Sequence, residues 1–232
     1  MIDHRPFSTL GSADHGWLHA KHHFSFADYM DRNRMHWGRL RVWNDDVIAP
    51  QTGFPPHPHR DMEIITYVRE GAITHEDSLG NHGRTEAGDV QVMSAGSGII
   101  HSEFNRETVP TRLFQIWIQT DELGAAPAWG ARPFPKADRA GKFVILASGS
   151  AEDTEALPIR AAARVAGATL KAGETVSFPL GANCFGYLVP ATGLIEIDDI
   201  RIHPGDGVAI SDVDVLVITA IEDSEIVLVQ TA

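Results

Sequence analysis

Short runs of β-forming residues recur along this chain and are separated by turn-forming residues. MEIITYVREG at 62–71, DVQVMS at 89–94 and LFQIWIQ at 113–119 are three such runs, with Gly, Pro, Asn or Asp close to their ends. Many short strands with turns between them are typical of antiparallel sandwiches and barrels. We therefore expect an all-β fold.

A proline-rich stretch, APAWGARPFPKADRAGK at 126–142, separates this region from a second β-rich region. A chain of 232 residues is long enough for two domains of roughly 100 residues each. We place the domain boundary in this stretch. The prediction is an N-terminal domain at 1–130 and a C-terminal domain at 131–232.

The C-terminal half is also β-rich and shares one short motif with the N-terminal half. The segments at 185–202 and 215–230 are interpreted as β-hairpins. AGDV at 87–90, before one expected strand, resembles PGDG at 204–207, before another. This similarity favours two related β-barrels.

One segment, FSFADYMDRNR at 24–34, lacks β patterning. It is either a short helix capped by Ser25 or an irregular arm. For His22 and His23 we expect side-chain hydrogen bonds to the backbone beside the barrel opening, with a pocket-lining role as the alternative. Four nearby aromatic residues either line an apolar pocket for a flat ligand or pack in the core, and core packing is expected for most of them: Phe24, Phe26, Trp43 and Phe54.

Charge and composition exclude several classes of function. The chain has 19 Lys and Arg against 31 Asp and Glu, a net charge of −12, which is the wrong sign for direct nucleic-acid binding. No segment reaches the roughly 20 apolar residues of a membrane span, and the start lacks the apolar run of a signal peptide. We expect a cytoplasmic protein. Cys184 is the only cysteine, so any metal must be held by His and carboxylate groups.

Two pairs of metal-binding residue types stand out. In His57-Pro58-His59 the histidines are two apart, so on an extended chain both imidazoles point to one side and reach one ion at about 2.1 Å. His101 and Glu103 repeat this spacing within GSGIIHSE. A barrel brings side chains of distant strands into one interior. We therefore predict one mononuclear metal site in the N-terminal domain.

The fourth ligand is left open by spacing alone. Glu63 follows His59 by four residues and, on an unbroken strand, faces the same side, so it competes with Glu103. Three imidazoles and one carboxylate suit Fe(II), Mn, Co, Ni, Cu(II) or Zn. A closed ligand shell would instead indicate a zinc-stabilised binding barrel. His75 and His82, in HEDSLGNHG, are interpreted as solvated loop residues.

Three fragments resemble the pirin family of the cupin superfamily: 22–31, 53–71 and 75–103. The combination of HPHRDxE with SAGxGIxHSE is highly specific, and the resemblance covers most of residues 15–120. It implies a bicupin fold, with two β-barrels of the double-stranded β-helix type and few short helices. For the C-terminal half the expectation rests on length and β pattern.

The resemblance also implies a ligand set and an activity. The N-terminal barrel would hold Fe(II), or a substitute divalent ion, through His57, His59, His101 and Glu103, whereas Glu63 would not be a ligand. Bacterial members most similar around HPHRDMEIITYV look like quercetin 2,3-dioxygenases, which open a flavonol ring and release carbon monoxide. The expected partners are a flavonol-like substrate and O2, and the expected state is a monomer.

The implied mechanism has a physical basis. A divalent ion lowers the pKa of a bound hydroxyl, so a flavonol would bind as its enolate. Glu103 is the expected catalytic residue, as acceptor of the hydroxyl proton. The alternative function is that of a non-enzymatic, pirin-like iron-binding protein whose oxidation state alters its binding to a regulatory partner.

Overall fold

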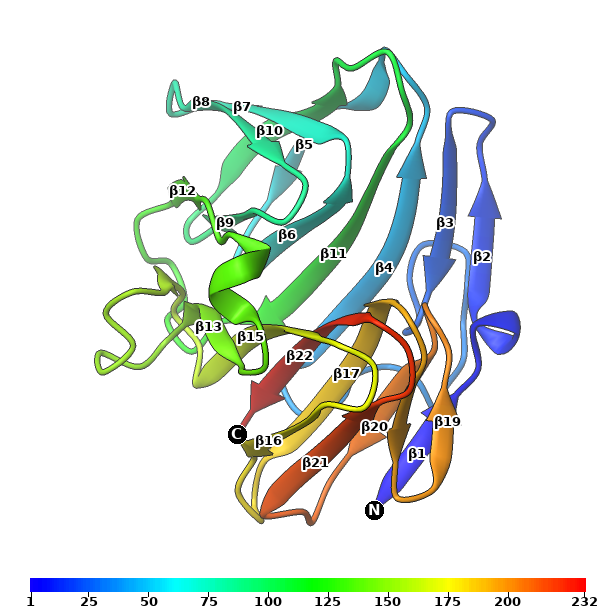
Figure 1. The fold of residues 1–232 in the computed structure, drawn as a ribbon. Coiled ribbons are helices and arrows are strands. Elements are labelled where there is room, and N and C mark those ends of the chain that lie inside the picture. Colours follow the sequence, from blue (N-terminus) through cyan, green and yellow to red (C-terminus); the bar gives the residue numbers. More distant parts are fainter.

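The computed structural model describes residues 1–232 and consists almost entirely of β-strands (Figure 1). Helix is confined to two short 3-10 turns, η1 at Phe7–Thr9 and η2 at Lys136–Arg139. No helix is long and apolar enough to cross a membrane. The expected all-β fold is confirmed, and the three β-forming runs fall on strands β6, β9 and β11.

The first barrel is built from a seven-stranded and a four-stranded sheet. The seven-stranded sheet has the order β12-β9-β6-β11-β4-β3-β2 and comprises β2 (Gly11–Asp14), β3 (Leu18–His22), β4 (Leu40–Ile48), β6 (Met62–Glu70), β9 (Val90–Ser94), β11 (Thr111–Gln119) and β12 (Ala128–Arg132). The four-stranded sheet has the order β5-β10-β7-β8 and comprises β5 (Thr52–His59), β7 (Ala72–Asp77), β8 (His82–Glu86) and β10 (Ile99–Asn105).

The second barrel repeats this plan. Its seven-stranded sheet has the order β1-β20-β17-β22-β15-β13-β14 and comprises β1 (Ile2–Arg5), β13 (Val144–Ser148), β14 (Leu157–Pro158), β15 (Ala163–Leu170), β17 (Phe185–Thr192), β20 (Gly207–Ile210) and β22 (Ser224–Thr231). Its four-stranded sheet has the order β16-β21-β18-β19 and comprises β16 (Thr175–Pro179), β18 (Ile195–Ile197), β19 (Ile200–Ile202) and β21 (Val215–Ala220).

The N-terminal strand β1 belongs to the second barrel. It runs antiparallel to β20, at the edge of the C-terminal sheet (Figure 1). The chain enters the first barrel only afterwards, with β2. The domain boundary near residue 130 stays a prediction. It does not hold for β1, which lies before residue 130 in sequence but belongs to the second barrel.

The two AGDV-like motifs occupy equivalent places in the two seven-stranded sheets. One precedes β9 and the other precedes β20, and each of these is the second strand of its sheet. Asp89 Oδ1 accepts a hydrogen bond from Phe134 N at 3.1 Å, just after β12. Asp206 Oδ1 accepts one from Phe7 N at 2.7 Å, just after β1. The structure therefore supports the relation between the two barrels.

The strand pairing predicted for the second barrel is wrong. β17 pairs with β20 and β22, whereas β18, the next strand in sequence, pairs with β19 and β21. β21 and β22 likewise lie in different sheets. At Gly193, with φ +74°, the chain crosses from one sheet to the other. Alternating apolar residues specify a strand but not its partner, so neither segment is a single hairpin. Segment 185–202 contains β17 followed by the short hairpin of β18 and β19, and segment 215–230 contains two strands of different sheets.

A hydrophobic core joins the two barrels. It contains 24 buried residues, most of them contributed by the two seven-stranded sheets. On β11, Phe114 and Ile116 pack in this core, whereas Gln115 and Trp117 point into the first barrel, because successive residues of a strand face opposite sides. Phe24 and Trp43 also pack there, as expected for core aromatics.

The interiors of the two barrels differ. A cluster of 17 buried hydrophobic residues fills the second barrel. The first barrel holds only two small apolar clusters, of six and four residues. Much of its interior is lined by polar side chains, which are stable there only with partners. The first barrel is therefore the part of the fold that has room for a site.

The segment at 24–34 is an irregular arm. Phe26 and Tyr29 form an isolated β-bridge, with turns and bends on either side. Ser25 Oγ donates to Asp31 O and accepts from Asp31 N, both at 2.8 Å. Of the two alternatives for this segment, the irregular arm is confirmed.

Candidate metal site

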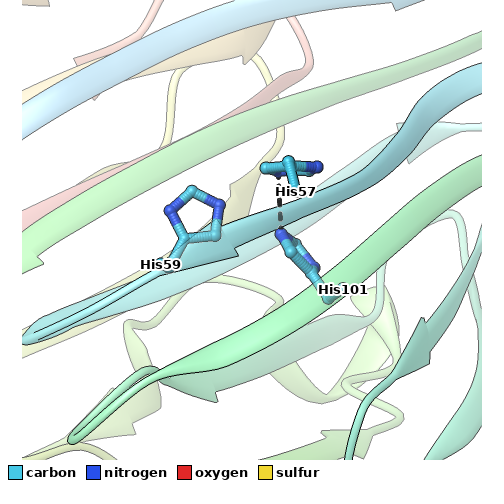
Figure 2. A group of neighbouring side chains, drawn as sticks. All are labelled: His57, His59 and His101. Carbon is cyan, nitrogen blue, oxygen red and sulfur yellow. Dashed lines mark hydrogen bonds between the residues drawn. The ribbon is translucent and has the colours of Figure 1, made fainter.

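Three histidines converge inside the first barrel (Figure 2). His57 and His59 lie at the end of β5, and His101 lies on the antiparallel neighbour β10, directly opposite His57. One ring nitrogen of each histidine lies within 4.8 Å of those of the other two. The HxH motif and the HxE motif thus meet because their strands are hydrogen-bonded neighbours.

The proton on the His57 ring can be placed from its partner. His57 Nδ1 lies 2.8 Å from Pro55 O. A carbonyl oxygen only accepts hydrogen bonds, so Nδ1 carries the proton and Nε2 carries the lone pair. His57 Nε2 faces His101 Nε2 at 3.0 Å (Figure 2).

A buried chain of hydrogen bonds places the proton on His101. Asp77 Oδ1 accepts from the backbone N–H groups of Leu79 and Asn81, at 2.9 and 3.1 Å, and Oδ2 lies 3.0 Å from His75 Nε2. Burial opposes ionisation, but hydrogen bonds from His75 and Asn81 hold the pKa of Asp77 below its ordinary value. The Asp77 carboxylate therefore accepts the proton of His75 Nε2.

The remaining nitrogen of His75 completes this chain. Burial lowers the pKa of His75 despite the neighbouring Asp77, so the ring carries a single proton. With that proton on Nε2, His75 Nδ1 accepts from His101 Nδ1, which lies 3.4 Å away. His101 Nε2 is then the unprotonated nitrogen, and it points toward His57.

These tautomers fit a bound divalent ion. Two nitrogens held at right angles around one ion, each at about 2.1 Å, lie about 3.0 Å apart. That is the spacing between His57 Nε2 and His101 Nε2. Burial, aided by the neighbouring histidines, lowers the pKa of His59 to about 4 and that of His101 to about 2. Protons therefore do not compete with an ion for the nitrogens of His59 and His101 near neutral pH.

Glu103 lies beside this triad. With His75 and His101 it forms a second group whose ligand atoms lie within 4.8 Å of one another. Its side chain is 3% exposed. Gln91 Nε2 donates to Oε1 at 2.6 Å, and Gln115 Nε2 donates to Oε2. Burial raises the pKa of Glu103 to about 7, although these hydrogen bonds lower it in part.

Glu63, the competing carboxylate, points away from the cavity. Between β5 and β6 the chain turns at Asp61, with φ +48°, and passes into the other sheet. The unbroken strand assumed from the spacing is therefore wrong. Glu63 shares a face of β6 with Ile65, which packs between the barrels, and it accepts a 2.5 Å hydrogen bond from Ser94 Oγ. Glu103 lines the cavity with the three histidines.

A row of polar side chains crosses five strands of the seven-stranded sheet beneath Glu103. Its members are paired in register from β3 through β4, β11 and β6 to β9, in the order His22, Asn44, Gln115, Thr66 and Gln91. His22 Nδ1 lies 2.9 Å from Asn44 Oδ1. Register alone therefore assembles the donors that hold the Glu103 carboxylate.

Three histidines differ from the sequence-based expectation. His22 lines the cavity, which was the alternative role, and His23 bonds to Tyr187 OH at 2.9 Å in the core between the barrels. Neither side chain bonds to the backbone beside the barrel opening. His75 is fully buried on β7, not solvated in a loop. The alternation of Ile73, His75 and Asp77 was the signal that could have shown this.

The cavity above the histidines has a volume of about 360 Å³. This is within the range of sites for small organic ligands, roughly 300–1,000 Å³. Its aromatic lining comes from four side chains: Trp17, Phe26, Phe54 and Trp117. Phe26 and Phe54 therefore line the cavity, and Phe54 also packs against the small apolar cluster of six residues in the first barrel. The site combines an apolar slot for a flat ligand with a cluster of metal-ligating groups.

Family models match both halves of the chain. The model described as Pirin matches residues 4–118, and the one described as quercetinase C-terminal cupin domain matches residues 145–230. A pirin-like protein of Caulobacter vibrioides is 66% identical over 232 residues, which is 100% of both chains. A quercetin 2,3-dioxygenase of Escherichia coli strain K12 is 41% identical over 229 residues, covering 98% of this chain and 97% of the relative.

A solved structure agrees with these matches. The bacterial pirin YhhW from Escherichia coli, in complex with nickel(II), superposes with a TM-score of 0.93 at 38% identity, covering 100% of this chain and 99% of that one. Both barrels are thus cupin-type domains, as the resemblance implied. The chain belongs to the pirin family and carries a quercetinase-type C-terminal cupin domain.

Proposed function

We propose that this protein is a metal-dependent dioxygenase that opens a flavonol ring with O2. The ion would be held by His57, His59 and His101, with Glu103 as the fourth ligand. The observation that carries this proposal is the convergence of unprotonated imidazole nitrogens beside a buried carboxylate in an aromatic-lined cavity. The naming of a relative at 41% identity as a quercetin 2,3-dioxygenase supports flavonol and O2 as reactants.

The ion that we propose is Fe(II), on the family resemblance. Three imidazoles and one carboxylate also accept Mn, Co, Ni, Cu or Zn, and the Escherichia coli relative was solved with nickel(II). When bound, the ion supplies Lewis acidity, which lowers the pKa of a coordinated hydroxyl. The experiment that tests the proposed function therefore loads each of several metals separately.

Glu103 is the group that we propose to take the proton of the flavonol 3-hydroxyl. Burial in the cavity wall raises the proton affinity of Glu103, which favours this role when the carboxylate swings partly away from the ion. Gln91 and Gln115 each donate one amide hydrogen to its carboxylate. These two donors fix the plane of the carboxylate, so it is oriented before the substrate arrives.

The aromatic walls are proposed to orient the flat ring system and to exclude water from it. Trp17 meets Phe54 edge to face with ring centroids 5.1 Å apart, and Phe26 meets Trp117 in the same way at 5.4 Å. Such pairs hold their rings in defined planes, against which a planar ligand can stack. The geometry favours a flat aromatic substrate over a flexible aliphatic one.

Anaerobic reconstitution tests the proposal. The metal-free protein is loaded separately with Fe(II), Mn(II), Co(II), Ni(II) or Cu(II), and quercetin and O2 are then added. We expect loss of flavonol absorbance together with release of carbon monoxide, and neither in His57→Ala. No turnover with any of these metals would refute the enzyme and favour the non-enzymatic iron-binding alternative.

A further inference from the structure

One carboxylic acid in the cavity wall has no partner in the protein. Asp46 lies on β4, in the sheet opposite the one that carries the three histidines, and it is 2% exposed. It lines the cavity, and its Oδ1 has no hydrogen-bond donor within reach. Its cross-strand neighbours are Ala20 and Leu113, whose side chains offer no polar group. Burying a carboxyl group without a partner is costly.

The two preceding residues of β4, in contrast, both have hydrogen-bond partners. Asn44 pairs with His22, and Asp45, on the opposite face of the strand, is bound by Arg69. Burial raises the pKa of Asp46 well above its ordinary value, and the charges of Asp45 and Glu103 add to this effect. Asp46 thus destabilises the fold and makes no hydrogen bond within the protein that offsets this cost. Such a cost is typical of residues kept for binding or catalysis.

We propose that Asp46 is a substrate-recognition residue whose carboxyl group hydrogen-bonds a ring hydroxyl of a polyhydroxylated aromatic ligand. This hydroxyl is distinct from the one bound at the ion. This inference rests on the proposed function for the class of ligand, and it names the residue that distinguishes between ligands of that class. A site built to hydrogen-bond a ligand hydroxyl rejects analogues that lack it, because the buried polar group is then left unpaired.

Binding to the metal-free protein provides the test, because it requires no turnover. Trp17 and Trp117 line the cavity, so ligand binding is followed by quenching of tryptophan fluorescence. The ligands are quercetin, which has several ring hydroxyls, and 3-hydroxyflavone, which has only the 3-hydroxyl. The variants are Asp46→Leu and Asp46→Asn. Asp138→Leu, at an exposed carboxylate on η2, is the matched control.

The expected result has two parts. Asp46→Leu weakens quercetin binding by roughly 10-fold to 100-fold, as for the loss of a hydrogen bond to a charged or buried group, and leaves 3-hydroxyflavone binding unchanged. Asp46→Asn, which keeps an acceptor oxygen, gives a smaller loss. The same Asp46→Leu substitution raises the melting temperature of the metal-free protein, because it removes an unpartnered buried carboxyl. Asp138→Leu changes neither measurement.

Several outcomes would overturn the inference. They are a failure of the wild type to bind quercetin, an equal effect of Asp46→Leu on both ligands, no effect on either, or a lowered melting temperature, which would indicate a structural role. Turnover of quercetin by a reconstituted Asp46→Leu protein at the wild-type kcat/KM would overturn it as well. The proposed dioxygenase fails independently, by absence of turnover in a wild type that still discriminates the two ligands.

Discussion

Replacing Asp77 by Asn should reverse the chain of hydrogen bonds that prepares His101 for the ion. Oδ1 of residue 77 faces the backbone N–H groups of Leu79 and Asn81, so the amide oxygen of Asn stays there. The amide nitrogen then takes the place of Oδ2 and donates to His75 Nε2. His75 Nδ1 becomes the donor to His101 Nδ1, and the proton moves to His101 Nε2, the nitrogen proposed to bind the ion.

The magnitude follows from the position of Asp77 behind a ligand. Losing such an orienting partner typically weakens metal affinity by roughly 10-fold to 100-fold, and each tenfold is about 1.4 kcal/mol. Competition against a chelator measures the dissociation constant, and ¹⁵N NMR of the metal-free protein shows which His101 nitrogen is protonated. Glu76→Gln is the matched control, since this neighbouring carboxylate is only partly buried and pairs with Arg106 at the surface.

The reasoning would be refuted if Asp77→Asn bound the ion within twofold of Glu76→Gln. It would also be refuted if the His101 tautomer were the same in Asp77→Asn as in the wild type. A thermal unfolding curve of each metal-free variant separates these results from a general loss of the fold.

Three further predictions concern the two carboxylates and the core. Glu103→Ala should lower ion affinity by more than about tenfold, whereas Glu63→Ala should leave it unchanged in chelator competition, and the reverse result would assign the ligand to Glu63. Glu225→Ala leaves the fully buried Arg139 guanidinium without its carboxylate at 3.6 Å, so urea unfolding should show a loss of roughly 3–5 kcal/mol; a loss below about 1 kcal/mol would contradict this. Burial, aided by Arg5, lowers the pKa of His23 well below its ordinary value, so protonation favours the unfolded chain and stability falls as pH drops below about 6.5. His23→Phe should remove up to about 1.4 kcal/mol per pH unit of that slope, and an unchanged slope would show that His23 is not its source.

The sequence predicted the parts of the site that depend on local geometry. His57 and His59 share a side because they are two apart on one strand, and the β-rich pattern implied a barrel that could bring His101 near them. Strand type was likewise predictable from alternation. These features need only the local chain and the closure of a barrel.

Features that depend on register across distant strands were not predictable. The two glutamines that hold Glu103 come from β9 and β11, and nothing near them in sequence marks them as neighbours. Spacing could not distinguish Glu63 from Glu103 as the fourth ligand for a related reason. A single residue with positive φ, Asp61, moves Glu63 into another sheet and onto its opposite face.

The role of Asp46 likewise depends on the arrangement of distant strands and could not be predicted from the sequence. In sequence it is one of two adjacent aspartates on a β-strand, with no motif around it. Its significance comes from the contrast with Asp45, which pairs with Arg69 on the other face of the strand. Only the three-dimensional arrangement shows which of the two is partnered and which faces the cavity.

The central claim is that three imidazoles of the first barrel hold one ion, and ion content per chain tests it most directly. The metal-free wild type and the variant with His57, His59 and His101 all changed to Ala are loaded with Fe(II) under anaerobic conditions, desalted and analysed for iron and protein. We predict one ion per chain in the wild type and none in the folded triple variant. Equal iron in both proteins, or none in either, would contradict the account.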